Sequence, residues 1–537
     1  MKKIFIIIAS VFLLNACTKI LEEKSYDFLV PSSFYKTEAD AEAAIIGVYN
    51  TLLSYGFYRQ SFWTYDGDSD HSSGPSWYFG AVGQGNYLGY WGTDNLWNDH
   101  YLMISRANSV LENVEGMSIN EDIKQRVLGE AYFFRGLAYF DLVRLYGGVP
   151  LRLSTVSSGK EAPSMGRSTV MQVYEQVISD LKAAEERLFP YQDSRSGGIG
   201  HVTKDIASAY LAKTYITIAS GSLEGVTVEV LTARKIDGDN QPYARYPFQK
   251  KTVAGLEGQD SQEYFRLAME KSAEVISGSG RTLFPAFMDN FKVANRHLNE
   301  NMLMAEFRGP SHSEDALVQV HSAEVLFGPG NGGGWTWGTR NFYNNYLEDG
   351  TKLDERALYG INHQPSINGK FYFPEEDVEY AVDGYTWVLA EDKAYTKKYD
   401  DITQKVLGGS DARYPILRLS DVYLINAEAN NELGNSVDAY ASLNTVRRRA
   451  KTLDAPAGMD KDDFRSFVLE ERGRELFLEN NRRFDLLRWG IYLDLMNFMN
   501  ADQFNIVKTR NARSLLLPIP QSEINSNTEI DINNPGW

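Results

Sequence analysis

The feature that most restricts the fold of this chain is a series of long amphipathic helical patterns. Apolar side chains recur at helical spacing over residues 38–53. Comparable patterns predict further helices at about 94–114, 130–146, 168–188, 203–219 and 262–276. The pattern at 130–146 is apolar on nearly every side, which is typical of a helix packed between neighbours. Two glycines and a proline within 147–150 predict where this helix ends.

The predicted helices come in pairs joined by short turns. Near the C-terminus, one apolar row lies at 419–427, Gly434 follows it, and a second row lies at 439–450. Two helices joined in this way form an αα-hairpin, and similar pairs span 94–146 and 168–219. We interpret the pairs as degenerate tetratricopeptide-like units, each of which leaves an apolar face exposed until the next pair stacks on it. The predicted fold is therefore mainly α, a superhelical scaffold of helical hairpins.

Helical periodicity is weak in the middle of the chain. A stretch interrupted by Gly and Pro covers 221–260, and residues from about 280 to 410 have no regular period. The Gly, Asn, Pro and aromatic residues there predict loops, short strands and short helices. We therefore expect an N-terminal helical region at 17–220, an irregular loop-rich region at 221–410 and a C-terminal helical region at 411–537.

The first residues predict export and lipidation. Two lysines precede an apolar stretch that is too short to span a bilayer, which is typical of a signal peptide covering residues 1–16. The sequence Leu-Asn-Ala-Cys at 14–17 matches the bacterial lipobox, in which the cysteine is acylated after export. Cys17 is the single cysteine of the 537 residues, so it has no disulfide partner in the chain and lipidation accounts for it. The alternative is cleavage after Ala16 that leaves an unused thiol.

Charge and motif content argue against several functions. The net charge of −17 disfavours a nucleic-acid partner, because binding phosphates requires a basic patch. The sequence contains no HExxH and no GxSxG, and the Gly-rich run at 328–334 lacks the Lys and Ser or Thr of a phosphate-binding loop. We therefore expect neither catalysis nor a cofactor.

Three carboxylates alternate at Asp66, Asp68 and Asp70, as they do at the start of a calcium loop. The sixth position of that loop is His71 and the twelfth is Trp77, where an EF-hand has glycine and glutamate. We expect no metal here. The segment is instead expected to be a solvated acidic loop, or one that offers hydrogen bonds to a sugar.

A dense run of charged residues at 470–488 could suggest paired catalytic carboxylates. On a helix, however, Arg474 would lie one turn beyond Glu471, and Arg483 one turn beyond Glu479. This is the ordinary spacing of supporting ion pairs, so we expect a structural role for the run.

Aromatic residues fall into two groups. Trp97 and Trp489 lie in helical patterns and Trp537 ends the chain, so all three are expected to be packing residues. Other rings lie in polar, Gly-rich segments, and loops of this kind normally run over the surface and carry function. Exposed rings can stack on the flat C–H faces of sugars, while polar side chains at the rim bind hydroxyls. The predicted ligand-binding residues are Trp77, Tyr78, Trp335 and Trp337, with Asp70, Asn331 and Arg340 at the rim.

Several blocks of this sequence resemble one protein family. They are FRGLAYFDLVRLYGGVPL from Phe134, LRLSDVYLINAEA and LNTVRRRA within 416–450, LEERGRELFLENNRRFDLLRWG from Leu469, and LLPIPQSEINSNTEIDINNPGW from Leu516. Together with the lipobox, these blocks look like the SusD/RagB family of outer-membrane nutrient-binding lipoproteins. The resemblance extends in order from Cys17 to the last residue.

The resemblance implies a tetratricopeptide-like scaffold with a ligand face built by the loop before the Trp97 helix and by the irregular middle region. It implies a SusC-like TonB-dependent transporter as partner, with the lipoprotein held on the outer membrane by its lipid and facing the cell exterior. An oligosaccharide or polysaccharide is the expected ligand, and a peptide is the alternative known from the RagB branch. A surface hydrolase and a non-catalytic repeat scaffold are alternatives from other functional classes.

Overall fold

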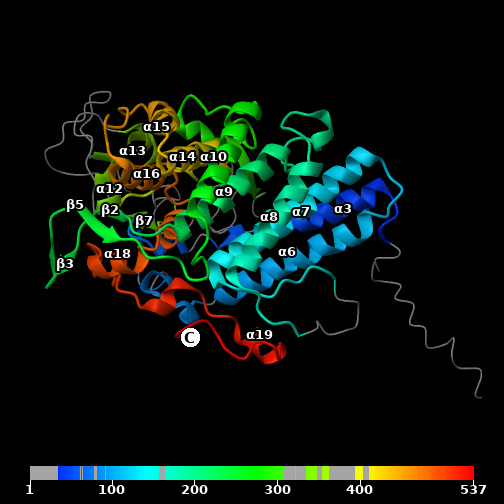
Figure 1. Ribbon diagram of the computed structural model, residues 1–537, viewed down its shortest axis with the longest axis horizontal. Helices are drawn as coiled ribbons and strands as arrows, with labels where there is room; N and C mark the ends of the chain where they lie inside the picture. Colours follow the sequence, from blue (N-terminus) through cyan, green and yellow to red (C-terminus); the bar gives the residue numbers. More distant parts are fainter. Residues whose placement is uncertain are drawn as a thin grey trace, which may run out of the picture.

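Long helices packed side by side form the N-terminal part of the molecule (Figure 1). The computed structural model describes residues 34–60, 62, 65–75, 77, 81–90, 92–155, 164–307, 321, 334–347, 354–361, 393–402 and 411–537. The long helices are α3 (Glu38–Tyr49), α6 (Thr93–Val114), α7 (Glu121–Tyr146), α8 (Val170–Arg187) and α9 (Lys204–Ser222). Helix α6 packs on α7, α7 on α8, and α8 on α9, so each predicted pair stacks on the next.

The C-terminal helices continue this stack on the other side of α9 (Figure 1). They begin with α10 (Ser261–Gly278), which contacts both α9 and α14 (Leu419–Glu432). Helix α14 pairs with α15 (Ser436–Arg449) across the turn at Gly434, whose φ is +83°. The remaining helices are α12 (Arg340–Leu347), α13 (Glu355–Gly360), α16 (Lys461–Glu475), α17 (Arg482–Arg488), α18 (Tyr492–Met499) and α19 (Gln521–Ser526). The predicted mainly α scaffold of helical hairpins is confirmed.

Helix boundaries follow the capping residues more closely than the apolar rows. Helix α7 begins nine residues before the predicted start, because the Asn120 side chain accepts hydrogen bonds from the amides of Asp122 and Ile123. Five of its first six residues are polar or charged, so the apolar pattern at 130–146 did not reveal this start. The helix ends as predicted at Gly147, which has φ +73°.

Short strands pair antiparallel and connect distant parts of the chain. Within the described residues they form four two-stranded sheets. These are β1 (Ser72–Ser73) with β7 (Trp337–Gly338), β2 (Thr227–Thr232) with β5 (Ala244–Gln249), β3 (Lys235–Ile236) with β4 (Asp239–Asn240), and β6 (Asn301–Glu306) with β8 (Arg413–Arg418). Short 3-10 or π turns lie at 50–53, 55–59, 65–67, 82–84, 87–89, 194–196, 287–291, 293–295 and 512–515.

The core lies between the stacked helices. Trp97 and Trp489 are buried, as predicted, and Trp537 packs against Tyr87 while its indole N–H donates to the Arg513 and Leu516 carbonyls. Among the described residues, no helix combines the length and apolarity required to cross a membrane.

The charged run at 470–488 is buried and forms ion pairs, which confirms the expected structural role. The predicted pair of Arg474 with Glu471 is present at 2.8 Å. The predicted pair of Arg483 with Glu479 is wrong, because α16 ends at Glu475 and the chain leaves the helix before Arg483. Most partners in this run come from other elements, since Arg472 pairs with Asp421 on α14 at 2.7 Å and Glu475 lies beside Arg418, Arg449 and Arg356. The run therefore joins helices to one another.

Candidate functional site

Two of the predicted rings meet at the surface although they are far apart in the sequence. The ring centroids of Trp77 and Trp335 lie 4.9 Å apart, with an angle of 79° between the ring planes. The side chain of Trp77 is 67% exposed, whereas Trp335 is partly buried and packs against the main hydrophobic core. This edge-to-face arrangement is a favourable one for aromatic rings. The two tryptophans form the aromatic pair on which the candidate site is built.

A small sheet brings the two tryptophan segments together. Strand β1 pairs with β7, so that Ser72 faces Gly338 and Ser73 faces Trp337. The Thr339 amide donates to the His71 carbonyl at 2.9 Å, and the Thr339 hydroxyl donates to the Asp70 carbonyl at 3.1 Å. These bonds fix the segment that follows Trp335 against the segment that precedes Trp77.

A third segment forms an antiparallel bridge to β7. Gly338 exchanges two backbone hydrogen bonds with Ala394, of 2.8 and 3.1 Å. The Lys508 ammonium is buried and donates to the carbonyls of Ser69, at 3.1 Å, and Ser72, at 2.8 Å. The sequence patterns did not identify Lys508, because an isolated lysine in a polar tail carries no signal of burial.

Asp70 supports the site from below and does not lie at its rim, so that prediction was wrong. Its carboxylate is buried and accepts two hydrogen bonds from the Arg482 guanidinium, of 2.9 and 2.7 Å. Burial by itself would raise the pKa of Asp70, but the charge of Arg482 lowers it below its usual range. Asp70 therefore stays ionised and is not available to a ligand.

Asp66 and Asp68 are also buried, which corrects the expected solvated loop. Asp68 lies between Arg483, at 3.2 Å, and Arg510, at 2.8 Å, and it accepts a hydrogen bond from the Tyr87 hydroxyl at 2.6 Å. The Asp66 carboxylate accepts a hydrogen bond from the Asn480 amide, and burial raises the pKa of Asp66 to about 8. In the part of the chain that the structure describes, no group of three His, Cys, Asp or Glu side chains is arranged to hold a metal ion.

Trp337 is only 6% exposed, so its prediction as a surface ring was wrong. It packs against Tyr395 and Phe504, with ring centroids 6.1 and 5.4 Å away, and the Lys393 ammonium lies 4.8 Å from its ring centroid. The reason is that Tyr395 and Phe504, which lie far from Trp337 in the sequence, pack on its ring. Trp337 therefore fixes the segment from which Trp335 projects.

The other predicted site residues have different outcomes. Arg340 is the first residue of α12, three residues beyond Trp337, and it is partly buried. Tyr78, Asn331 and Cys17 lie outside the described residues. The structure thus brings together Trp77 and Trp335 and assigns supporting positions to Asp70 and Trp337.

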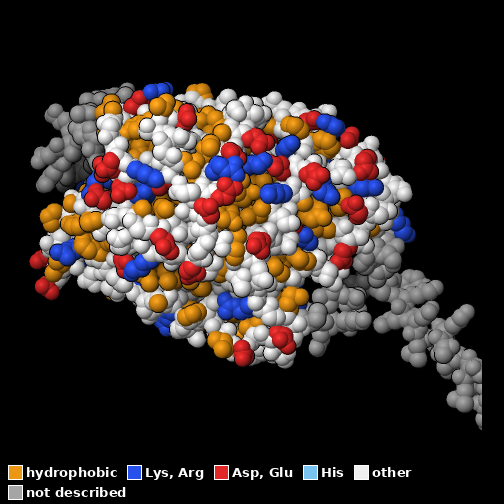
Figure 2. Space-filling model, in the orientation of Figure 1, with side chains coloured by type: hydrophobic (Ala, Val, Ile, Leu, Met, Phe, Trp, Pro, Cys, Tyr) orange, Lys and Arg blue, Asp and Glu red, His pale blue; other side chains and the backbone are white. Residues whose placement is uncertain are grey.

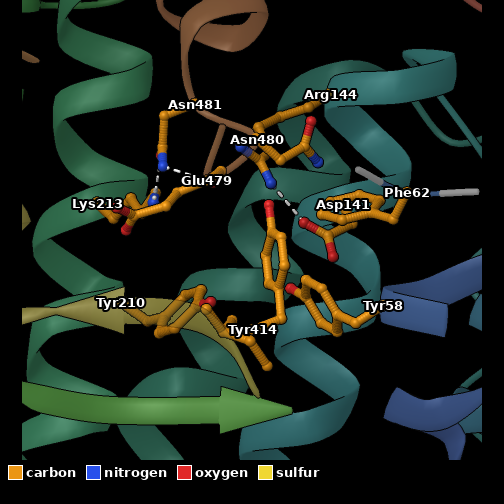
Figure 3. A pocket seen from close by; sticks show the side chains of 11 residues that line it. Tyr58, Phe62, Asp141, Arg144, Tyr210, Lys213, Tyr414, Glu479, Asn480 and Asn481 are labelled. Carbon is orange, nitrogen blue, oxygen red and sulfur yellow. Dashed lines mark hydrogen bonds and ion pairs between the residues drawn. The ribbon is translucent and has the colours of Figure 1, made fainter. Parts of the chain in front are cut away.

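A small cavity lined mostly by buried residues has carboxylates in its wall (Figure 3). It has a volume of about 20 Å³, which is enough for one water molecule and too small for a sugar ring. Of its two carboxylates, Asp141 pairs with Arg144, and Glu479 pairs with Lys398 and Arg418. Carboxylates held in ion pairs around so small a space do not form the open pair that glycoside hydrolysis needs.

The surface around the helices carries both signs of charge. On the face seen in Figure 2, Lys and Arg side chains are interspersed with Asp and Glu over the helical stack. Exposed apolar side chains are scattered between them. This distribution does not concentrate charge of one sign on that face.

Comparison with known proteins identifies two family models that match separate parts of the chain. Residues 390–537 match the model described as SusD family, and residues 19–216 match the model described as starch-binding associating with outer membrane. Trp77 lies in the second of these ranges, and Trp335 lies between the two.

Curated relatives match most of the chain at modest identity. SusD-like protein P25 of Formosa agariphila is 25% identical, over 100% of this chain and 99% of the relative. Starch-binding protein SusD of Bacteroides thetaiotaomicron is 23% identical, over 80% of this chain and 76% of the relative.

Solved structures share the fold. A SusD homologue from Bacteroides thetaiotaomicron superposes with a TM-score of 0.75 at 21% identity, covering 94% of this chain and 98% of that chain. A structure described as a laminarin-binding SusD-like protein superposes with a TM-score of 0.69 at 20% identity, covering 94% of this chain and 100% of that chain.

Proposed function

Because the chain belongs to the SusD family, we propose that it binds oligosaccharides or polysaccharides at the cell surface and passes them, uncleaved, to a SusC-like transporter. The observation that carries this proposal is the aromatic pair, in which the exposed Trp77 packs against the partly buried Trp335. A relative with this fold is described as laminarin-binding and another as starch-binding, which favours a glycan over a peptide.

The geometry of the pair suits a sugar chain. Sugar rings present flat C–H faces, and the exposed face of Trp77 offers a matching plane for one of them. Trp335 lies nearly perpendicular to Trp77 and packs against it, so Trp77 loses little conformational freedom when a ligand binds. A preformed aromatic surface binds more tightly than one that must be ordered first.

The contacts that hold the two tryptophan segments in place support the same function. The β1–β7 sheet fixes the two segments, and the buried ion pair of Asp70 with Arg482 fixes β1 to α17. The protein must bind and release its ligand repeatedly. A rigid support keeps the binding surface in the same conformation each time.

Membrane attachment through Cys17 belongs to this proposal. The lipobox at 14–17 would give a lipidated first residue after cleavage, and several acyl chains hold a protein on a membrane far more firmly than one. The model matching residues 19–216 is described as associating with the outer membrane, which agrees with such an attachment. The partner transporter is the one that the family resemblance implies.

The test is isothermal titration of the lipid-free mature chain with laminarin, starch and a wider glycan panel. We expect Trp77→Ala and Trp335→Ala each to weaken binding by about 30-fold, the effect of removing an aromatic binding hot spot. The control is Tyr359→Ala, since Tyr359 on α13 is 45% exposed and should not affect affinity. Unchanged affinity in both tryptophan variants would remove the site.

Two further results would redirect the functional assignment. Release of shorter sugars during incubation with a bound glycan, measured by mass spectrometry, would indicate a hydrolase. Co-purification of short peptides, with no response to any glycan, would indicate the peptide-binding alternative.

A further inference from the structure

A pocket of about 350 Å³ lies away from the aromatic pair, where several separate segments of the chain meet. Its walls come from the end of α7, the start of α8, Thr217 of α9, the loop at 251–256, residues 484–493, residues 512–516 and Pro535. The floor contains the buried side chains of Val143, Leu256 and Tyr492, whereas Leu515 at the wall is exposed. The pocket is therefore an apolar hollow that opens to solvent, of a size that suits a small molecule.

The charged side chains around this pocket all have the same sign. Arg144, Lys251, Arg488 and Arg513 line it, and none of its lining residues is acidic. This is notable in a chain with a net charge of −17. A low-dielectric wall bordered by cations attracts a ligand that carries a negative charge.

Three of these cations have carboxylate partners outside the pocket. Arg144 pairs with Asp141, Lys251 with Asp494, and Arg488 with Glu428 and Asp485. Their charges are largely satisfied within the protein. They add to the positive electrostatic potential of the pocket, but a ligand is not required to neutralise them.

Arg513 differs from the other three cations. Its guanidinium lies 4.5 Å from the ring centroid of Trp537, and among the described residues it forms no ion pair with a carboxylate. Its Nε is shielded from solvent and has no hydrogen-bond partner there. Arg513 is therefore the lining cation without a carboxylate beside it in the described part of the chain, and its partly buried guanidinium could form a charge-assisted hydrogen bond with a carboxylate in the pocket.

We propose that this pocket binds a small amphipathic carboxylate, whose apolar chain fills the hollow and whose head group pairs with Arg513. The apolar walls favour a ligand with an apolar chain. The basic residues at the wall, with no acidic residue among the lining residues, favour a ligand with a negative charge. This site is independent of the glycan site, because neither Trp77 nor Trp335 lines the pocket.

The test is isothermal titration of the lipid-free mature chain with decanoate at submicellar concentration, with 1-decanol as the neutral match and acetate as the polar match. We expect decanoate to bind at least 10-fold more tightly than decanol, and acetate not to bind. Arg513→Gln should weaken decanoate binding by 10-fold or more without weakening decanol binding, because it removes a charge-assisted hydrogen bond.

A second variant keeps the proposal testable if Arg513→Gln alters the tail of the chain. Ala254→Phe places a large side chain at the exposed part of the pocket wall and should weaken both decanoate and decanol. Arg448→Gln on α15 is the matched control and should change neither, because Arg448 is exposed and lies outside the pocket.

The outcomes separate this pocket from the glycan site. Trp77→Ala should leave decanoate binding intact, and Arg513→Gln should leave glycan binding intact. The proposal fails if decanoate does not bind the wild-type chain, or if it binds equally well to the wild type, Arg513→Gln and Ala254→Phe.

Discussion

The guanidinium of Arg482 forms a two-pronged ion pair with the carboxylate of Asp70, across 412 residues of sequence. Arg482 Nε donates to Oδ1 at 2.9 Å and Nη2 donates to Oδ2 at 2.7 Å. Both side chains are buried, so the pair is shielded from solvent and salt. It connects the loop that precedes the aromatic pair to the first turn of α17, and thus links the proposed ligand site to the C-terminal helices.

Asp70→Asn should destabilise the fold strongly. The substitution removes the closer of two carboxylates beside the buried Arg482 charge and leaves Glu470, at 3.5 Å; breaking a buried ion pair typically costs about 3–5 kcal/mol. Urea denaturation followed by circular dichroism should give a correspondingly lower free energy of unfolding. The control is Asp454→Asn, because Asp454 forms an exposed ion pair with Arg448 and its loss should shift the midpoint little. Equal midpoints for both variants would contradict a supporting role for Asp70.

Asp66 should make the free energy of unfolding depend on pH. Its pKa is about 8 in the folded chain because the side chain is buried, and about 3.9 in an unfolded chain. Between these values the unfolded state is ionised while the folded state keeps the proton. The stabilisation from this group is complete below about pH 4 and is lost as the pH rises to about 8, by up to about 1.4 kcal/mol per pH unit.

Asp66→Asn should remove this dependence while an amide oxygen still accepts the bond from Asn480. We expect the variant to gain stability relative to the wild type as the pH rises from 5 to 7.5, by up to about 3 kcal/mol. Burial lowers the pKa of His71 to about 4, which has the opposite effect between about pH 4 and 6.5, but His71 is present in both proteins and cancels in the difference. A pH-independent difference between the two urea midpoints would refute the assignment.

Gly473→Ala should weaken glycan binding through the support of the aromatic pair. A β-carbon at Gly473, within α16, would collide with the imidazole of His71, which directly precedes β1 and lies against Phe342. The imidazole of His71 therefore has to move, and we expect this movement to displace β1. The expected result is a lower glycan affinity, measured by titration, together with a lower melting temperature.

The control for this variant is Gly47→Ala in α3. No atom lies near a β-carbon at Gly47, and alanine is the better helix former by about 1 kcal/mol. Gly47→Ala should therefore raise the melting temperature and leave glycan affinity unchanged. If Gly473→Ala behaved in the same way, His71 would not be coupled to the site.

Cys17→Ser should release the protein from the membrane. The lipobox predicts that acyl chains are attached at this single cysteine, and the substitution removes the thiol that would carry one of them. Membrane fractionation should place the wild type with the outer membrane and the variant in the soluble fractions. A mature wild-type chain with a free Cys17 thiol, detected by mass spectrometry of its N-terminal peptide, would favour the alternative of an unused cysteine.

The helices could be predicted from the sequence because their determinants are local. Apolar spacing located α6, α8, α9 and α10 closely, and the turn at Gly434 revealed the α14–α15 hairpin. Polar loops rich in glycine and aromatic residues likewise identified Trp77 and Trp335 as candidates. Each of these signals is contained within about 20 neighbouring residues.

Burial of the loop residues was decided by the tertiary structure alone. Asp70 and Trp337 were expected at the surface, because nothing near them in the sequence indicates a partner. Arg482 reaches Asp70 from a distant helix, and Phe504 covers Trp337 from the C-terminal tail. The sequence by itself therefore determined the helical scaffold, the lipobox and the set of candidate rings. Which ring faces solvent depends on contacts between distant segments, and such contacts exist only once the chain has folded.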